Sequence, residues 1–532
     1  MDHSLLLLVL LLLLLVAAVS VLAERTRFPS PVLMLLAGVV LAFVPGFPVI
    51  RLEPDVVLLV LLPPLLYMGG VGMSWRGFRS NLRPILLLAV GCVLFSAAVL
   101  AFVMHELLHM PWAVGFVLGA IVSPPDAVAA LALFRTIRLP RRVVTILEGE
   151  SLTNDATALV ILGLALDALT TGRFSLGAAA SRFVLIACGE IAFGVALGWL
   201  ALWLRHLARA PRSEVLLALA TPYMAFWPPH ALGGSGVIAC VAAGLYVSWN
   251  GRRFIPPATR LQGYFIWDLV LWATESLVFL LGGLQAHRVA DAIETIGWPR
   301  ALAVGSLVVL TVVIVRFVWV YPAVYLPRLL PSLRRSDPAP DWRVSFFIAF
   351  AGIRGVDSLA AALLVPDKVN GAPFAEYSLI LFCTYMVIAV TLVALGGALP
   401  RVVGALGLAR LGREEEQANR RDEHHVRLRG IDAVLDFLGR TASKCGDAAA
   451  WLSQVYSQRR RSLADHARAK PDPSIAEEAA FEHHLLQIER DEIARAYDEN
   501  RLTDEARRRI ERELDLEEAR ISHRHAKASP PD

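Results

Sequence analysis

The apolar run PWAVGFVLGAIVSPPDAVAALALF at residues 111–134 carries Ser123-Pro124-Pro125-Asp126 near its middle. A run of this length is enough to cross the roughly 30 Å hydrocarbon core of a bilayer as a helix. Each proline removes a backbone donor, and Pro125 also disfavours the helical conformation at Pro124, so the helix must break beside Asp126. A break at membrane depth is tolerated only where protein or a water-filled cavity surrounds it. The segment therefore predicts a discontinuous membrane helix, with a half-helix that starts near Asp126.

Comparable apolar runs recur through the 532 residues, of which 56% are hydrophobic, and the mean hydropathy is +0.56. About 20 apolar residues are needed for one membrane crossing, so the composition predicts an all-α polytopic membrane protein. The leucine-rich run 5–15 has no basic region before it and is interpreted as the first span rather than a secretory signal. The thirteen predicted spans cover residues 4–23, 28–45, 54–71, 84–105, 111–134, 143–168, 182–204, 214–229, 235–249, 264–286, 301–326, 344–365 and 377–398.

Basic residues alternate between the connections that join these spans. One set of alternate connections holds nineteen basic residues, all of them arginine, and the other set holds six. Short cytoplasmic connections carry the excess of Lys and Arg, so the pattern predicts an external N-terminus, a cytoplasmic C-terminus and an odd number of spans. The scarcity of lysine among the 51 basic residues is typical of a GC-rich bacterium, and the bacterial plasma (inner) membrane is the expected location.

The chain changes character beyond residue 400. Residues 1–400 hold all the predicted spans, whereas 401–532 are rich in acidic and basic runs. Apolar residues at helical spacing in 426–438 predict helices that pack together, bind a partner or rest on the membrane. We therefore expect a transmembrane domain at 1–400 and a cytoplasmic, charged helical tail at 401–532. A solvated helical hairpin without a specific function is the alternative for the tail.

Acidic residues inside apolar segments are the main indication of function. Burying one costs on the order of 2.5–3.5 kcal/mol on insertion scales, so each suggests a functional role. Asp126 follows the helix break, where freed carbonyls near Ser123 are expected to bind a cation; capping of the half-helix is the alternative role of Asp126. Segment 143–168 adds Ser151 and Asp155, which lie four residues apart on one helical face. That face offers a hydroxyl and a carboxylate, hard oxygen ligands suited to a small alkali cation.

Glu150 lies on the adjacent face of the same segment, together with Asn154. A buried carboxylate needs a positive partner if it is to stay charged. Arg316 stands alone in the apolar run 301–326 and is the natural candidate. We therefore expect Glu150 and Arg316 to form a structural ion pair that takes no part in proton exchange.

Two further acids leave alternatives open. Glu275 is either a packed, protonated acid or part of an access path. Asp357 is interpreted as a local ion-pair partner of Arg354 and is not expected to act in transport. The five cysteines show neither a zinc-site spacing nor a disulfide framework, and no phosphate-binding P-loop motif is present. No cofactor and no nucleic-acid partner are expected.

The patterns around these acids resemble one known family. RRVVTILEGESLTNDATAL at 141–159 and SPPDAVAA at 123–130 are similar to segments of the monovalent cation:proton antiporter-1 family of sodium/proton exchangers. The resemblance extends over about residues 25–400. Further similar stretches are LLPPLLY at 61–67, SWRGFRSNLRPI at 74–85, GGSGVIACVAAGLY at 233–246, LVFLLGGLQ at 277–285 and GIRGVDSLAAAL at 352–363.

The resemblance implies thirteen helices in two inverted repeats, with crossed, discontinuous helices at the fifth and twelfth segments, and a homodimer. It also implies that Asp155 is the carboxylate shared by proton and cation. The other positions that it carries over are Asn154 and Ser151 in the site, Asp126, Pro124 and Pro125 at the first break, Arg354 beside the second break, and the Glu150–Arg316 pair.

The sequence departs from the family pattern at three positions. Pro125 stands where a threonine is common, and Met68 follows Tyr67 where some relatives carry an acid. Asp357 occupies a position that is more often apolar. These departures bear on cation preference rather than on the class of protein.

The expected activity is secondary antiport, in which H⁺ and a monovalent cation, Na⁺ or else K⁺, compete for Asp155. The Asn154-Asp155 pair resembles that of electroneutral exchangers, and the resulting role would be pH and cation homeostasis. A cation channel or another solute carrier on the same scaffold is one alternative. An intramembrane serine protease is another, because Gly233-Gly234-Ser235-Gly236 fits a GxSG pattern and His287 follows. A third assigns the principal role to the tail, as a sensor.

Overall fold

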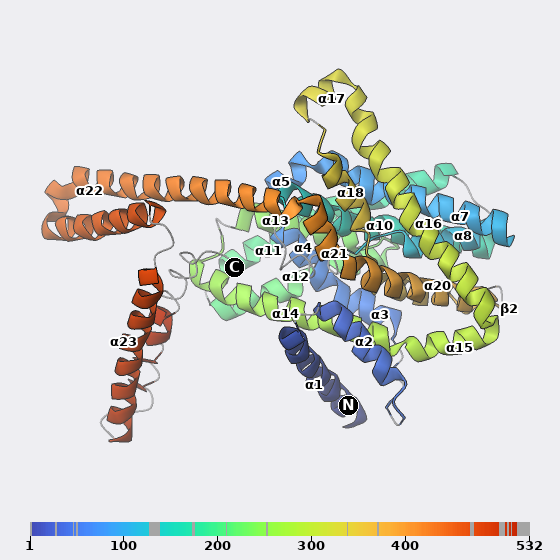
Figure 1. Ribbon diagram of the computed structural model, residues 1–532, viewed down its shortest axis with the longest axis horizontal. Helices are drawn as coiled ribbons and strands as arrows, with labels where there is room; N and C mark the ends of the chain where they lie inside the picture. Colours follow the sequence, from blue (N-terminus) through green and yellow to red (C-terminus); the bar gives the residue numbers. More distant parts are fainter. Residues whose placement is uncertain are drawn as a thin grey trace. The chain divides into compact units, whose positions relative to one another are not determined.

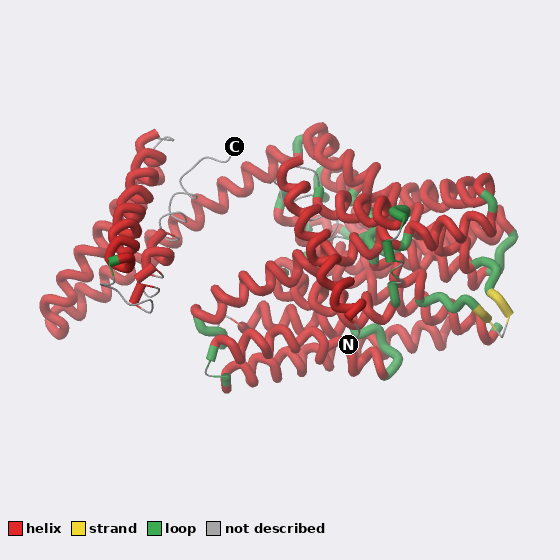
Figure 2. The backbone as a smooth tube through the Cα atoms, turned by 90° about the horizontal axis from the view of Figure 1, so that it is seen from below, coloured by secondary structure: helices red, strands yellow, loops and turns green. Residues whose placement is uncertain are grey.

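The protein is almost wholly helical (Figures 1 and 2), as the sequence predicts. The computed structural model describes residues 3–26, 29–45, 47–48, 50, 52–126, 139–172, 176–208, 210–251, 254–337, 339–369, 372–468, 473–499, 506–507, 510–511 and 513–518. The half-helix predicted to start near Asp126 falls on residues 127–138, which lie outside the described part.

The first half of the membrane region contains most of the helices expected there. The elements are α1 (His3–Thr26), α2 (Ser30–Ala42), α3 (Pro54–Val56), η1 (Val57–Leu61), α4 (Leu62–Gly72), α5 (Trp75–Ser80), α6 (Leu82–Leu86), η2 (Leu87–Cys92), α7 (Val93–Leu108), α8 (Trp112–Val122), α10 (Arg141–Thr171) and α11 (Leu176–Leu207). The π-helical turns η1 and η2 continue into the α-helices beside them, so 54–72 and 82–108 each form one long helical segment.

The second half and the tail follow the same plan. The elements are α12 (Pro211–Ala231), α13 (Val237–Asn250), α14 (Pro257–Leu284), α15 (Ala286–Ile296), α16 (Trp298–Tyr325), η4 (Leu326–Leu329), α17 (Pro331–Ser336), α18 (Trp342–Phe350), α19 (Asp357–Leu363), β1 (Lys368–Val369), β2 (Ala372–Pro373), α20 (Tyr377–Val390), η5 (Thr391–Leu395), α21 (Gly396–Leu406), α22 (Leu408–Arg468) and α23 (Pro473–Asp498).

Seven helical segments of the described part are long and apolar enough to cross a membrane, and shorter apolar helices accompany them. The long segments are 54–72, 82–108, 141–171, 179–207, 262–291, 298–329 and 377–406, and the shorter helices include α2, α8 and α13. The chain is therefore a multi-pass membrane protein. The count of thirteen spans and their arrangement in two inverted repeats stay predictions.

Helix α15 and the β1–β2 hairpin were not predicted from the sequence. In α15 the apolar residues Val289 and Ile293 are buried, while Arg288 and Asp291 are exposed. The helix is amphipathic, so a search for continuous apolar runs passes over it. Figure 1 shows α15 between the ends of α14 and α16, where it packs against α20.

Small residues allow several helices to approach one another closely. A Cβ atom at Gly38 of α2 would lie 2.8 Å from the Cα of Gly283 in α14, and one at Gly70 of α4 would lie 3.2 Å from the Cα of Gly244 in α13. Gly119 of α8 has the same relation to Ala97 of α7. Such contacts supply dispersion energy where lipid tails remove the hydrophobic drive between helices. They hold together the bundle that contains the polar site.

The chain divides into two compact units, residues 1–413 and 414–532. Within the second unit, α22 folds back on itself (Figure 1), so that Arg460 Nε lies 2.6 Å from Asp432 Oδ1. Leu486 and Leu514 form a small separate core with Ile493. The tail is therefore a helical unit with contacts of its own.

Candidate functional site

Two helices of the bundle are interrupted, and the interruptions meet. Helix α8 ends at Val122, and residues 123–126 are not helical. Helix α18 ends at Phe350, and α19 begins only at Asp357. The backbone N–H of Asp126 donates a hydrogen bond of 2.8 Å to the carbonyl of Ile353, which joins the two breaks. The sequence resemblance implied both breaks, and the hydrogen bond shows that they lie together.

Arg354 connects the second break to the end of α8. Its Nε donates to the carbonyl of Val122 (3.0 Å), its Nη2 donates to the carbonyl of Ser123 (3.2 Å), and its Nη1 donates to the carbonyl of Gly352. A cation is favourable at the C-terminal end of a helix, where carbonyls lack helical partners. Arg354 thus occupies carbonyls that the sequence interpretation assigned to a bound cation, and no described ion pair links it to Asp357.

The structure brings Glu150 of α10 and Arg316 of α16 together as a bidentate pair. Arg316 Nη1 lies 2.5 Å from Glu150 Oε1, and Nη2 lies 2.9 Å from Oε2. Both side chains are only 1% exposed. Arg316 Nη2 also donates to the carbonyl of Ile348 near the end of α18 (3.0 Å). Each interrupted helix is therefore capped by a buried arginine, and only Arg316 has a carboxylate partner as well.

Two glycines of the second break make room for these charged side chains. A Cβ atom at Gly355 would lie 1.8 Å from Asp126 Oδ2, and one at Gly352 would lie 2.4 Å from the Cδ atom of Arg316. Real Cβ contacts are never this short, so a larger residue at either position must displace a charged group. The Asp126 carboxylate accordingly packs directly against the backbone of the second break.

Three carboxylates gather at the meeting point of the breaks. Asp155 of α10 interacts electrostatically with both Asp126 and Asp357, and these two also interact with each other. All three are partly exposed, although the residues at 123–125 and 351–356 are buried. Asp357 was expected to pair with Arg354, and that expectation was wrong. Its position after a helix break, like that of Asp126, is the sequence signal that would have indicated this grouping.

Neutral oxygens lie beside these carboxylates. Asn154 Nδ2 donates to the carbonyl of Pro125 (2.7 Å), which holds α10 against the first break. The Oδ1 atom of Asn154 and the Oγ atom of Ser123 are buried without a hydrogen-bond partner in the protein, whereas Ser151 is buried and has a partner. Unsatisfied buried oxygens are rare and costly. Although the three aspartates interact electrostatically, the described residues contain no group of three His, Cys, Asp or Glu side chains close enough together to hold a metal ion, so these neutral oxygens are further candidate ligands for an alkali cation.

Glu190 of α11 is a buried acid that the sequence analysis did not single out. It accepts hydrogen bonds from the backbone N–H groups of Ser235 (2.5 Å), Gly236 (2.9 Å) and Ile238 (3.1 Å), and from the Ser235 hydroxyl. It therefore caps α13, and its charge is stabilised at a helix N-terminus. His287 contacts Asp291 and Phe43. Because the Ser235 hydroxyl is held by a carboxylate, the structure offers no support for a serine protease.

Comparisons with known proteins find related chains. The family model of transmembrane sodium/hydrogen exchangers matches residues 10–404. An uncharacterised Na⁺/H⁺ exchanger of Mycobacterium tuberculosis is 33% identical over 515 residues, which cover 94% of this chain and 93% of that protein. The Na⁺/H⁺ antiporter ApNhaP of Aphanothece halophytica is 28% identical, with 88% of each chain covered.

A relative named for several cations and a solved structure are also similar to this chain. The sodium, potassium, lithium and rubidium/H⁺ antiporter of Bacillus subtilis is 32% identical over 388 residues, which cover 70% of this chain and 57% of that protein. The solved structure of the sodium proton antiporter MjNhaP1 from Methanocaldococcus jannaschii has a TM-score of 0.59 and 20% identity. The match covers 75% of this chain and 96% of MjNhaP1, which shows a shared fold.

Proposed function

The chain belongs to the family of transmembrane sodium/hydrogen exchangers, and from this premise we propose that Asp155 is the group at which proton and cation are exchanged. One observation carries the proposal. In the described part of the chain, Asp155 has no ion pair with an arginine or lysine, although Glu150, five residues earlier on α10, is fully paired with Arg316. A carboxylate without a fixed positive partner is free to take a proton or a cation instead.

Exchange follows from competition at the same oxygens. A proton on Asp155 removes the charge that attracts a cation, and a bound cation stabilises the ionised carboxylate. Asp126 adds negative charge, while Ser123 Oγ and Asn154 Oδ1 are unpartnered oxygens able to coordinate the cation. If only the loaded site reorients across the membrane, transport of one ion requires the return of the other. No ATP is needed for this cycle.

We favour Na⁺ as the cation, with K⁺ as the second candidate, and a bound ion would be substrate rather than cofactor. The neutral Asn154 beside Asp155 supports electroneutral exchange, one proton for one cation. K⁺ remains a candidate because the similar Bacillus subtilis protein is named as an antiporter of potassium as well as sodium. Such an exchanger would serve pH and cation homeostasis.

The cellular setting is also a proposal. The distribution of arginines supports an inner-membrane exchanger with an external N-terminus and a cytoplasmic tail at 401–532. Family membership supports a homodimer. The tail then remains available for regulation without taking part in the transport step.

Inside-out vesicles from an antiporter-deficient host provide the test. With the interior acidified, Na⁺ or K⁺ is added at several pH values, and dissipation of the pH gradient is recorded. Asp155→Asn should reduce the response to the background of vesicles that lack the protein. Asp167→Asn is the matched control, because Asp167 lies on the same helix but is exposed and paired with Arg182 at the surface.

The same vesicles separate the rival functions. A channel or uncoupled carrier would move the cation without dissipating the pH gradient, and retention of exchange by Asp155→Asn would overturn the proposal. Removal of the residues after Arg413 tests the sensor hypothesis. Exchange by the truncated chain would show that the tail is not the principal functional part.

A further inference from the structure

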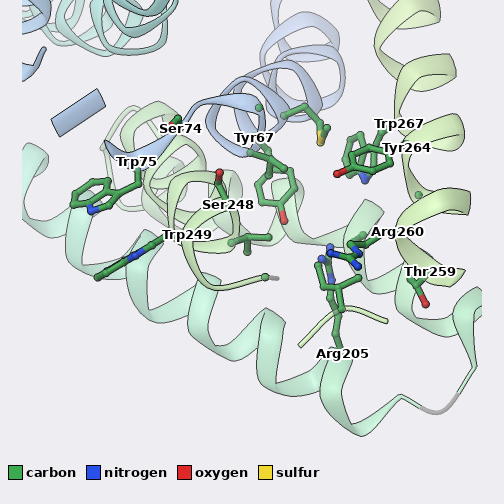
Figure 3. Close-up of a pocket in the computed structure, with 18 of the residues that line it drawn as sticks. Tyr67, Ser74, Trp75, Arg205, Ser248, Trp249, Thr259, Arg260, Tyr264 and Trp267 are labelled. Carbon is green, nitrogen blue, oxygen red and sulfur yellow. The ribbon is translucent and has the colours of Figure 1, made fainter. Parts of the chain in front are cut away.

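A second polar region lies among α4, α5 and α11 to α14, and none of the site residues named above lines it. It is a cavity of about 1240 Å³ (Figure 3). Tyr67 of α4, Arg205 of α11 and Arg260 of α14 point into it. Since no residue of α8, α10 or α19 lines the cavity, it is distinct from the carboxylate site.

The walls of this cavity are strongly positive. Among the described residues that line it are four arginines, Arg76, Arg79, Arg205 and Arg260, and one acid, Glu214. All four belong to the connections predicted to be cytoplasmic. Such a charge balance repels a monovalent cation and attracts an anion. The cavity is therefore unsuited to be the cation entrance and well suited to hold an anionic group.

Several buried polar atoms of the cavity lack partners in the protein. The Arg205 side chain is 6% exposed, and its Nε makes no hydrogen bond. The Tyr67 hydroxyl faces Arg205 (Figure 3) and interacts with it and with Thr221, although neither contact has normal hydrogen-bond geometry. The unpartnered Arg205 Nε and the Tyr67 hydroxyl that faces Arg205 match a ligand with several acceptor oxygens, such as a phosphate.

The remaining lining residues indicate where that phosphate group comes from. Trp75 and Trp249 stack at the cavity with ring centroids 5.6 Å apart, and Trp249 and Tyr264 are largely exposed. Amphipathic rings of this kind concentrate at the membrane–water interface. Glu214 Oε2 is buried without a partner and can accept a hydrogen bond from a hydroxyl or amine of the ligand. Basic pockets between helices on the cytoplasmic side suit phospholipid head groups.

We propose that this cavity binds a phosphate-bearing anion through Arg205, Arg260 and the Tyr67 hydroxyl. The exposed rings of Trp249 and Tyr264 favour an anionic phospholipid of the cytoplasmic leaflet as the source of this phosphate group. The phosphate oxygens accept from the two guanidinium groups and from the phenol. A head-group hydroxyl donates to Glu214. The ligand thereby neutralises a positive cluster that the protein leaves uncompensated.

The test measures thermal stability of the purified full-length protein after removal of lipid. Phosphatidylglycerol, phosphatidylcholine or inorganic phosphate is added back in detergent, and Tm is followed. Phosphatidylglycerol should raise Tm by about 3 °C or more, and phosphatidylcholine should not. Arg205→Gln should raise the apparent Kd for phosphatidylglycerol by about tenfold. Arg212→Gln, an exposed arginine near Arg205 that does not line the cavity, should leave binding unchanged.

Because Arg205 is buried, the Arg205→Gln variant risks a folding defect of its own. Arg260→Gln replaces an exposed lining arginine and is the second variant, for which the same loss of affinity is expected. A Tm response to phosphate as well as to lipid, lost in both variants, would support a site for small anions. An equal response in Arg260→Gln and the unchanged protein, or no response to any probe, would overturn the proposal. Neither readout depends on cation exchange.

Discussion

Glu150 and Asp155 lie on the same helix, separated by a rise of about 7.5 Å, and their surroundings differ in one respect. Glu150 faces a guanidinium that bonds both of its oxygens, so its charge is balanced inside the protein. Asp155 faces two further carboxylates and interrupted backbone. The charge of Glu150 is balanced by Arg316, whereas no arginine or lysine of the described residues forms an ion pair with Asp155.

In the proposed function, this difference separates charges that stabilise the fold from charges that are used in transport. A buried, bidentate pair has no reason to exchange protons, because either partner alone would leave an uncompensated charge. Asp155 interacts with the like charges of Asp126 and Asp357, which favours its binding of a proton or a cation. In the proposed function, protons and cations bind at the crossing, next to an ion pair that fixes the helices around it.

The largest expected effect comes from breaking the balanced region. Glu150→Gln leaves the Arg316 charge buried without its partner, which should lower the free energy of unfolding by about 3–5 kcal/mol. Thermal unfolding of the purified variant measures this loss. Glu148→Gln, two residues away and outside the pair, should cost much less.

The double variant Glu150→Gln/Arg316→Gln sharpens the comparison. It removes both charges, so it should recover part of the stability that the single change loses. If Glu150→Gln instead unfolds at the temperature of the unchanged protein but no longer exchanges cations, the pair acts in transport, and the contrast with Asp155 disappears.

The intermediate effect concerns Asp357. Its replacement by asparagine removes one of three like charges at the crossing, so the ionised form of Asp155 is easier to maintain. Exchange in vesicles should persist, with its pH profile displaced to lower pH by about one unit and with weaker apparent affinity for the cation. The pH dependence of gradient dissipation measures this, and Asp367→Asn, an exposed acid after α19, is the control. An unchanged profile would remove Asp357 from the site.

The sequence alone predicted the parts of the site that depend on local rules. Each proline of Pro124-Pro125 removes a backbone donor and so favours a break, although Pro228-Pro229 stays inside α12 without one. Acids and a lone arginine in apolar runs favour pairing. Neither inference needs the tertiary fold. The positions of the long apolar helices followed from hydrophobic length for the same reason. The amphipathic α15 and the short helices α5 and α17 were not predicted, because they carry no long apolar run.

Contacts between distant segments could not be predicted in this way. Asp126 and Ile353 are joined by one backbone hydrogen bond across more than 200 residues, and that contact decides what surrounds Asp357. It also gives Arg354 the carbonyls at the end of α8 as partners. The prediction that Arg354 and Asp357 form a local ion pair was wrong because the two side chains have different neighbours. Arg354 donates to the carbonyls of Val122 and Ser123, whereas Asp357 lies near Asp126.

The smallest effect is expected at Asp337, where ion pairs form outside the membrane. Arg83, Arg142 and Arg328 lie 2.5, 2.7 and 2.7 Å from its carboxylate, which is 23% exposed. Partial burial opposes ionisation, but the hydrogen bonds and charges of Arg142 and the other two arginines outweigh it and lower the pKa of Asp337 below its usual value. The stabilisation is therefore present above pH about 4 and lost as the pH falls further.

Asp337→Asn should lower the free energy of unfolding at neutral pH by about 1 kcal/mol, because water and salt screen such pairs. The difference between the variant and the unchanged protein should shrink below pH 4 and in high salt, as thermal unfolding across pH and ionic strength would show. The Glu150–Arg316 pair should not respond to salt, since screening ions cannot reach a pair that is 1% exposed. Equal salt sensitivity of Asp337→Asn and Glu150→Gln would mean that water reaches both, and that burial does not distinguish the two regions.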